Sequence, residues 1–292
     1  AIILTFNEDQ HIARCIASLE GIADRVCVVD SFSKDKTVEI ARSLGADVFQ
    51  NPWKNYATQF NWALKNCQIT DDWTLRIDAD EVLDPELRDN MRTYLNDPSV
   101  GVNAVYLKRK MVFLQQPITH GFFYPAKMLR LWRTGEGRVE QRWMDEHVLV
   151  ENAVTTLLDG DLVDENLNDL SWWIEKHNGY ATREVYDIVE SREVQRLDQS
   201  VHLGGQARVK RFLKENVYAN LPTSIRGSFY FFYRYVLGCG FLDGKSGFFF
   251  HFLQAFWYRT LVDAKLSELE QAAEKENLSP YELLSRDGIY EE

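Results

Sequence analysis

The chain has 292 residues, a length that suits one large α/β domain with an appendage. With 45% hydrophobic and 26% charged residues it has an ordinary globular composition, and its net charge of −11 argues against a general nucleic-acid binder. The four cysteines show no C-x-x-C spacing, so we expect neither zinc nor disulfides and a reducing, cytoplasmic compartment. The chain begins at Ala1 without a methionine, so we expect a few residues to be missing before it.

Up to about residue 110, strand and helix patterns alternate, which predicts a mostly parallel sheet covered by helices. Strands are expected at 1–5, 25–30, 46–49 and 73–78. The expected helices are one that is capped by Asn7 and carries Ile12, Ile16 and Leu19, one at 37–44 closed by Gly45, one at 56–66, and one from Pro85 to about Leu95.

From Val102 the pattern changes to longer alternating segments at 104–113 and 127–133, which predict a mixed or antiparallel half of the same domain. After about Ser171 the pattern is helical to the end. Residues 205–265 hold nine basic and three acidic residues, a net charge of +6, whereas residues 266–292 hold two basic and eight acidic residues, a net charge of −6.

The basic part of this helical region is also rich in aromatic residues. Residues 206–221 place basic and apolar side chains at helical spacings, and residues 229–235 and 248–258 concentrate Phe, Tyr and Trp. A basic, aromatic amphipathic helix can lie in the headgroup layer of an anionic membrane, although no run reaches the ~18 apolar residues of a spanning helix. Packing on the catalytic domain or on another subunit, as in a homo-oligomer, is the alternative.

The chemistry is expected at the carboxyl ends of the strands. Neither G-x-G-x-x-G nor G-x-x-x-x-G-K-[ST] occurs, which argues against dinucleotide oxidoreductases and P-loop enzymes. Instead, one strand is expected to end at Asp30 and another in Asp78-Ala79-Asp80-Glu81. Two carboxylates separated by one residue can share Mg²⁺ or Mn²⁺, which would neutralise a substrate diphosphate; turn and cap chemistry is the alternative.

Two further segments are ambiguous by themselves. Thr5 and Asn7 at the end of the first strand can bind a base or ribose, but they equally suit a helix cap. Asp145-Glu146-His147, taken alone, is typical of a solvated loop between Trp143 and the apolar run 148–150.

Taken together and in order, these motifs resemble a known family. Thr5-Phe6-Asn7-Glu8, Val29-Asp30-Ser31 and Asp78-Ala79-Asp80-Glu81 resemble the nucleotide-sugar half of inverting family 2 glycosyltransferases, which have the GT-A fold. The resemblance is closer to the lipopolysaccharide-core β-glucosyltransferase branch. It extends over nearly the whole chain through residues 59–64, 143–148, 176–181 and 251–265.

The resemblance implies an α/β, Rossmann-like GT-A domain at residues 1–170 and a helical C-terminal region at 171–292. Residues 1–100 would form the nucleotide-sugar half of the GT-A domain and residues 101–170 the acceptor half. A nucleotide-binding role is implied for Thr5, Asn7, Glu8, Asp30, Gln59, Asn61 and Asp78. The resemblance also implies that Asp80 is the more direct ligand of Mn²⁺ or Mg²⁺, with Asp78 beside it.

For the catalytic base, which deprotonates the acceptor hydroxyl, the resemblance implies Glu146, with Asp145 as the alternative. His147 is either a third metal ligand or a neighbour that orients Glu146. His177 is either a core or surface histidine or a residue of the acceptor side.

The expected activity is metal-assisted, inverting transfer of a hexose, glucose favoured, from a UDP-sugar. The expected acceptor is a lipopolysaccharide core, an exopolysaccharide or a lipid-linked glycan. The alternatives are transfer onto polyprenyl phosphate and a non-catalytic partner of glycan assembly at the membrane surface. We expect a cytoplasmic protein with no nucleic-acid partner, and a lipid acceptor would add peripheral contact with the cytoplasmic face of the inner membrane.

Overall fold

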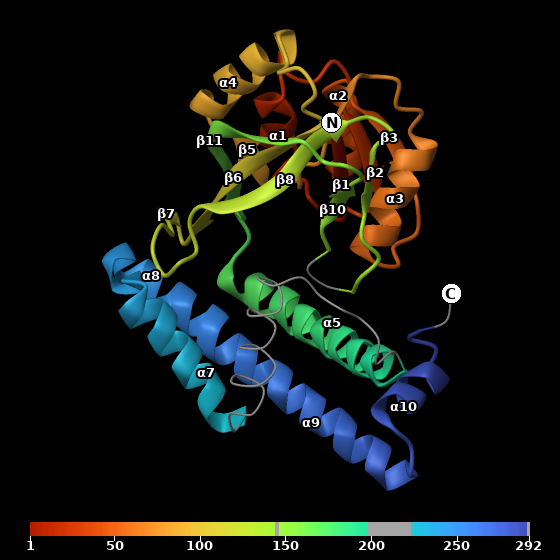
Figure 1. Ribbon diagram of the computed structural model, residues 1–292, viewed down its shortest axis with the longest axis vertical. Helices are drawn as coiled ribbons and strands as arrows, with labels where there is room; N and C mark the ends of the chain where they lie inside the picture. Colours follow the sequence, from red (N-terminus) through yellow and green to blue (C-terminus); the bar gives the residue numbers. More distant parts are fainter. Residues whose placement is uncertain (144–145, 198–222, 291–292) are drawn as a thin grey trace. The chain divides into compact units, whose positions relative to one another are not determined.

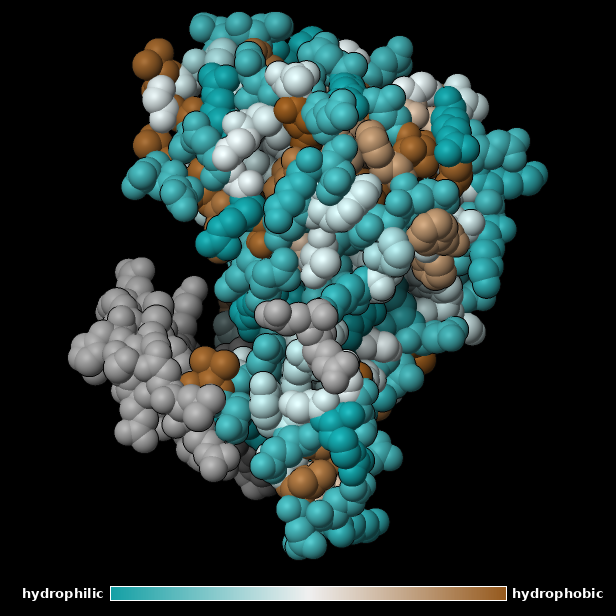
Figure 2. Space-filling model, turned by 90° about the vertical axis from the view of Figure 1, so that its right-hand side faces the viewer, coloured by the Kyte–Doolittle hydropathy of each residue, from teal (hydrophilic) through white to brown (hydrophobic). Residues whose placement is uncertain are grey.

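The computed structural model describes residues 1–143, 146–197 and 223–290. The chain forms two units, Ala1–Asn168 and Asp169–Glu292. Figure 1 labels their helices and strands. On the face shown in Figure 2, hydrophilic residues cover most of the described surface of the first unit.

The first unit begins with a parallel sheet in the order β1-β2-β3, formed by Ile2–Thr5, Cys27–Asp30 and Asp47–Gln50. In this register Thr5 lies directly opposite Asp30, so the last residues of two strands are neighbours at one edge. Three of the four predicted strands are confirmed here, with boundaries that differ by one or two residues.

The four predicted helices of this half are confirmed as α1 (Ile12–Ser18), α2 (Thr37–Ser43), α3 (Tyr56–Asn66) and α4 (Pro85–Asn96). Asn55 caps α3 and Asp84 caps α4, each by accepting a 2.8 Å hydrogen bond from the backbone three residues on. The prediction that Asn7 caps α1 is wrong. The cap position of α1 is His11, because Asn7 adopts a left-handed backbone with φ of 57° and the chain turns once more before the helix.

The second sheet is mixed, as predicted, in the order β4-β8-β6-β11-β5, with β7 beside β6. Its strands are β4 (Trp73–Leu75), β5 (Glu81–Leu83), β6 (Ala104–Phe113), β7 (Gln116–Pro117), β8 (Ala126–Arg133) and β11 (Thr155–Glu165). A parallel bridge between Ile2 and Arg76 joins it to the first sheet. A separate hairpin consists of β9 (Gly137–Val139) and β10 (Val148–Val150).

Two features of this sheet differ from the prediction. The expected strand at 73–78 ends at Leu75, because Arg76 makes only the isolated bridge and the chain then turns. Glu81, expected in that turn, begins the new strand β5 and pairs with Asp164 of β11. Thus the polar Asp78–Asp80 turn lies between two short strands that belong to the same sheet.

The alternation of apolar residues along β1 explains how helices cover both faces of the parallel sheet. Ile3 points into a core cluster with Ile12 of α1 and Leu87 of α4. Its neighbour Ile2 points into a second cluster with Phe60 of α3. Each of these side chains is at most 1% exposed, and burying one side chain of this size contributes about 1.5–3 kcal/mol.

The second unit is helical in its described residues, as predicted. It contains α5 (Leu170–Leu197), α7 (Thr223–Phe232), a π-helical turn at Tyr233–Leu237, a 3₁₀ turn at Gly240–Asp243, α8 (Gly244–His251), a second π-helical turn at Phe252–Trp257, α9 (Tyr258–Glu276) and α10 (Pro280–Arg286). Its core packs Val185 and Val189 of α5 against Val262 and Leu266 of α9. Within the described residues, every helix is too short or too polar to cross a bilayer. The helix predicted at 206–221 lies outside the described residues.

Candidate active site

The edge where β1 and β2 end brings together two of the predicted nucleotide residues. The hydroxyl of Thr5 donates to Oδ1 of Asp30 over 3.1 Å, and Asp30 is fully buried. Oδ2 of Asp30 accepts from the backbone of Ser33 at 2.9 Å and from Nε2 of Gln50 at 3.2 Å, while Oδ1 also accepts from the Ser33 hydroxyl. Asp30 therefore organises the loop after β2 as well as ending that strand.

Gln59 and Asn61, both on α3, are bound to the protein itself. Gln59 is fully buried and donates from Nε2 to the Ser31 hydroxyl and to the carbonyl of Asn51, both at 3.0 Å. The amide of Asn61 pairs both ways with the backbone of Val139, at 2.8 and 2.9 Å, and so fixes β9 against α3. These contacts favour supporting roles, and direct contact of either residue with a nucleotide stays a prediction.

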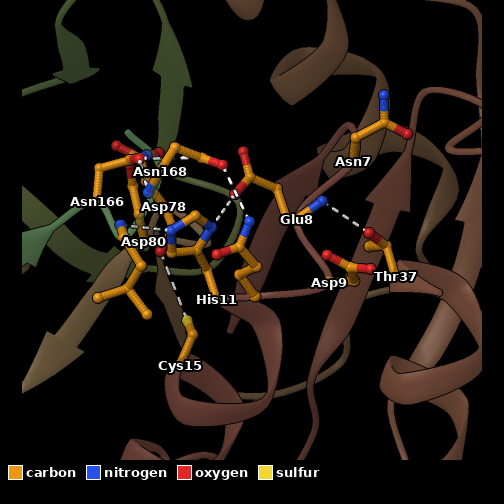
Figure 3. Close-up of polar contacts among 12 residues, drawn as sticks. Asn7, Glu8, Asp9, His11, Cys15, Thr37, Asp78, Asp80, Asn166 and Asn168 are labelled. Atoms are coloured by element: carbon orange, nitrogen blue, oxygen red, sulfur yellow. Dashed lines mark hydrogen bonds and ion pairs between the residues drawn. The ribbon is translucent and has the colours of Figure 1, made fainter. Parts of the chain in front are cut away.

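Asn7 and Glu8 also lie at this edge, and both are tied to the loop that follows β2. Oδ1 of Asn7 accepts from the backbone of Lys34 at 2.9 Å, and the backbone N–H of Glu8 donates to the hydroxyl of Thr37 at 2.7 Å. The carboxylate of Glu8 lies 2.7 Å from Nδ1 of the buried His11, as Figure 3 shows. The loops after β1 and β2 are thus held together by the residues predicted to bind nucleotide.

The Asp78 carboxylate is surrounded by cationic and hydroxyl groups. Oδ1 accepts from the Tyr56 hydroxyl at 2.5 Å, and Oδ2 lies 3.2 Å from Nη2 of Arg130. Burial raises the pKa of Asp78, but the nearby charges of Arg130 and Arg76 and the Tyr56 hydrogen bond outweigh it, so this pKa lies well below its usual range.

Arg130, only 1% exposed, explains why a second carboxylate lies beneath this turn. Its Nη2 is 2.6 Å from Oε1 of Glu81, whose other oxygen accepts from the backbone of Asp78 at 2.9 Å. Burial and the charge of Asp78 raise the pKa of Glu81 to about 8, against the opposing effect of Arg130. The buried guanidinium of Arg130 therefore contacts both Asp78 and Glu81 and holds the Asp-x-Asp turn in place.

Asp80 has different surroundings from Asp78. Its Oδ2 accepts a 3.0 Å hydrogen bond from Nδ2 of Asn166, beyond the end of β11. Within the described residues no three His, Cys, Asp or Glu side chains form a metal cluster, so His147 does not complete one with Asp78 and Asp80. Mg²⁺ commonly binds one or two carboxylates together with substrate phosphates and water, and this Asp-x-Asp turn has that donor set.

The loop that joins β9 to β10 carries the predicted base. Oε1 of Glu146 lies 3.3 Å from Nη2 of Arg76, and Nε of the same arginine donates to the Tyr56 hydroxyl at 2.9 Å. A chain of contacts thus runs from Glu146 through Arg76 and Tyr56 to Asp78. Asp145 lies outside the described residues.

His147 and His177, for which the sequence left alternative roles, lie in different units. His147 is 71% exposed and lies 3.4 Å from Oε2 of Glu140 across the same loop. His177 is stacked on Trp173 of its own helix, donates from Nδ1 to that residue's carbonyl at 2.8 Å, and faces Gln254 through Nε2 at 2.9 Å. His177 is thus a partly buried histidine whose ring contacts other residues of the second unit.

Several residues of this site were missed in the sequence, namely His11, Tyr56, Arg76, Arg130 and Asn166. Arg76 did carry a signal, because an arginine inside an otherwise apolar strand next to two aspartates needs an acidic partner. His11 and Asn166 carried none, since their partners lie on other elements.

The fold agrees with the result of comparing the chain with known proteins. Residues 1–164 match the model of glycosyl transferase family 2, and the chain belongs to this family. This confirms the family resemblance and the α/β fold with a helical C-terminal region.

Among related sequences, the chain is 31% identical over 199 residues to the lipopolysaccharide core biosynthesis glycosyltransferase LpsC of Rhizobium meliloti, covering 65% of this chain and 72% of LpsC. It is 52% identical over 91 residues to an uncharacterized glycosyltransferase of Rickettsia bellii. The chain spans about a third of the length of the rickettsial relatives that it matches, 30% in this case.

Solved structures also resemble the chain in part. A mannosyltransferase from Pyrobaculum calidifontis, in complex with GDP-Man and Mn²⁺, aligns over 91% of this chain and 85% of its own, with a TM-score of 0.49 and 16% identity. Glucosyl-3-phosphoglycerate synthase of Mycobacterium tuberculosis, in complex with Mn²⁺ and UDP, aligns over 38% of this chain and 42% of its own, with a TM-score of 0.31 and 22% identity.

Proposed function

We propose that the protein is a metal-assisted, inverting glycosyltransferase that transfers a hexose, glucose favoured, from a UDP-sugar to a lipopolysaccharide-core or lipid-linked glycan. The observation that carries the proposal is the Asp-x-Asp turn, whose two carboxylates differ in surroundings. Arg130 and the Tyr56 hydroxyl contact the carboxylate of Asp78, and the side-chain amide of Asn166 donates to the carboxylate of Asp80. Two carboxylates one residue apart in a turn are a donor set that suits a divalent cation, with Asp80 as the more direct ligand in this proposal.

A divalent cation at Asp80 would neutralise charge on the diphosphate as the bond to the sugar breaks. The nucleoside would lie at the edge where Thr5 meets Asp30, with Glu8 beside it on the loop after β1. Gln59 and Asn61 would support this edge from α3.

Inversion places the acceptor on the face of the sugar opposite the leaving UDP. In this proposal Glu146 takes the proton of the acceptor hydroxyl while the acceptor oxygen forms its bond to the anomeric carbon. The bond from that carbon to the β-phosphate oxygen breaks, and UDP leaves with the electron pair. Arg76 would orient the Glu146 carboxylate before the acceptor binds.

The helical unit suits an acceptor that is anchored in a membrane. Exposed apolar side chains gather on α7, α8 and the turns beside them, and we call them the apolar surface: Ile225, Phe229, Phe232, Tyr233, Val236, Leu237, Phe241, Leu242, Phe248, Phe249 and Phe252. Residues 227–258 contain a single acidic residue, Asp243, whose side chain is 3% exposed, while Lys245 is exposed. In a chain of net charge −11, this stretch, which has no exposed acidic side chain, suits an anionic lipid headgroup layer.

The donor site is tested by calorimetric titration with UDP, with and without Mn²⁺. We expect binding that Mn²⁺ strengthens, and loss of the Mn²⁺ effect in Asp80→Asn. Asp89→Asn, a change at an aspartate that is 77% exposed, is the matched control and should behave as the native protein. Absence of UDP binding in both conditions would contradict the enzyme and leave the alternative of a non-catalytic assembly partner.

The membrane contact is tested by sedimentation with phosphatidylglycerol and phosphatidylcholine vesicles. Leu237→Glu together with Leu242→Glu should abolish binding to the anionic vesicles, whereas Val100→Glu, at a fully exposed apolar residue of the first unit, should not. Equal binding of all variants would contradict a lipid-facing apolar surface. So would a native dimer that the double variant converts to monomers, because that result assigns the surface to subunit contact.

A further inference from the structure

A short segment connects the last strand of the first unit to the residue where the second unit begins. This connecting segment, residues 165–168, begins with the last residue of β11 and ends at Asn168. The backbone N–H of Glu165 donates to the carbonyl of Asp80 at 3.1 Å. Nδ2 of Asn166 donates to the Asp80 carboxylate at 3.0 Å. The connecting segment thus contacts both the main chain and the side chain of the proposed metal ligand.

The orientation of the Asn166 amide follows from its other partners. Its Oδ1 accepts from the backbone N–H of Asn168 and from Nδ2 of Asn168, both at 3.0 Å. Asn168 is held in turn by Gln10, whose Nε2 donates to its Oδ1 at 3.1 Å. Because the Asn166 oxygen is engaged with two donors, its NH₂ group faces Asp80, which can only accept while it is ionised.

The same segment reaches the nucleotide end of the site through His11. The backbone N–H of Leu167 donates to Nε2 of His11 at 2.8 Å, so that nitrogen carries no proton. The proton therefore lies on Nδ1 and is donated to Oε2 of Glu8 at 2.7 Å. Figure 3 shows Asn166 and Asn168 gathered beside Asp80 and His11.

We propose that Asn166 and His11 are positioning residues of the donor site, Asn166 for Asp80 and His11 for Glu8. This inference rests on the proposed function. Each donates one hydrogen bond that helps to orient its carboxylate. Asn166 belongs to the connecting segment, and His11 accepts from the backbone of Leu167 in that segment. The segment therefore contacts both the diphosphate end and the nucleoside end of the proposed donor site.

The two roles predict different effects on binding. Removing the partner that orients a metal-binding side chain commonly weakens metal binding by about 10–100-fold. Asn166→Ala should therefore weaken Mn²⁺ binding to the UDP complex by at least about tenfold and leave UDP binding without metal unchanged. His11→Gln should weaken UDP binding equally with and without Mn²⁺.

The test measures Mn²⁺ binding by electron paramagnetic resonance and UDP binding by calorimetry, alongside the melting temperature of each variant. Asn168→Ala should reproduce part of the Asn166→Ala effect, because it releases the Asn166 oxygen. The matched control is Asn103→Ala. Asn103 also donates to a carboxylate, Glu136, and accepts from a backbone N–H, that of Val154, both at 2.8 Å, but neither partner belongs to the proposed site.

Native Mn²⁺ affinity in Asn166→Ala, with loss in Asp80→Asn, would overturn the positioning role while leaving the metal site intact. A loss in Asn103→Ala equal to that in Asn166→Ala would also overturn it, because the effect would then be general. Native Mn²⁺ affinity in Asp80→Asn itself would contradict the proposed function instead, so the two failures are distinguishable.

Discussion

Nη2 of Arg76 lies 3.3 Å from Oε1 of Glu146, and these two side chains are only 7% and 13% exposed. The pair joins the residue that follows β4 to the loop between β9 and β10. The arginine orients the carboxylate that is proposed to take the proton of the acceptor hydroxyl.

Replacing the proposed base should affect turnover and not donor binding. Glu146→Gln keeps the size of the side chain but cannot take a proton, so kcat should fall by about 10²–10⁴-fold while UDP affinity with Mn²⁺ stays unchanged. The measurement is UDP release with a UDP-hexose and truncated lipopolysaccharide-core acceptors. Glu140→Gln in the same loop is the control. Activity lost in Asp145→Asn but kept in Glu146→Gln would assign the base to Asp145.

The Tyr56 hydroxyl should contribute to stability, unlike that of Tyr94. Tyr56→Phe removes the bond to Asp78 and the acceptor of Arg76, and leaving such buried groups unpaired costs about 1–3 kcal/mol. In the described part of the chain the buried Tyr94 hydroxyl has no hydrogen-bond partner, so Tyr94→Phe should change the free energy of unfolding very little. Urea unfolding of both variants checks this, and equal values would contradict the role of Tyr56.

The pH dependence of stability should reveal His177. Burial lowers the pKa of His177 from 6.5 to about 4, so the folded protein keeps it neutral while the unfolded chain takes up a proton below pH 6.5. The free energy of unfolding should therefore fall as the pH drops from 6.5 towards 4. At about 1.4 kcal/mol per pH unit the total is about 3 kcal/mol. In urea unfolding at several pH values, His177→Gln should lose this part of the slope; an unchanged slope would contradict the assignment.

Gly160 and Gly45 should differ in their tolerance of alanine. Both have left-handed backbones, with φ of 92° and 81°, which disfavours any side chain by about 1–2 kcal/mol. A Cβ at Gly160 would lie 2.2 Å from the backbone nitrogen of Leu87, whereas a Cβ at Gly45 would meet nothing within 4 Å. Gly160→Ala should therefore lower the melting temperature much more than Gly45→Ala. Similar melting temperatures would show that β11 can move away from α4.

The parts of the fold with a regular pattern were predictable from the sequence. Helices α3 and α4 have cap residues, Asn55 and Asp84, and their boundaries follow from local hydrogen bonding. The run 155–165, which forms β11, was not recognised as a strand. Its Asp and Gly residues interrupt the apolar pattern, and pairing with β6 and β5 on both sides stabilises it instead.

The polar residues at the strand ends of the candidate site were predictable from the sequence, but most of their partners were not. The turn at Asp78 and Asp80 follows a strand in sequence, and that position indicated a ligand. Its partners come from distant segments: Arg130 is 52 residues from Asp78, and Asn166 is 86 residues from Asp80. These pairings depend on the strand order of the mixed sheet. The local pattern of residues along the sequence does not specify that order.

The amide of Asn61 pairs both ways with the backbone of Val139, and this makes α3 a shared anchor for two loops of the site. The hairpin that carries the Glu146 loop is attached at its root to α3, and Gln59 of the same helix supports Ser31 in the loop after β2. The segment that carries the proposed base and the segment that ends in Asp30 therefore take their positions from one helix.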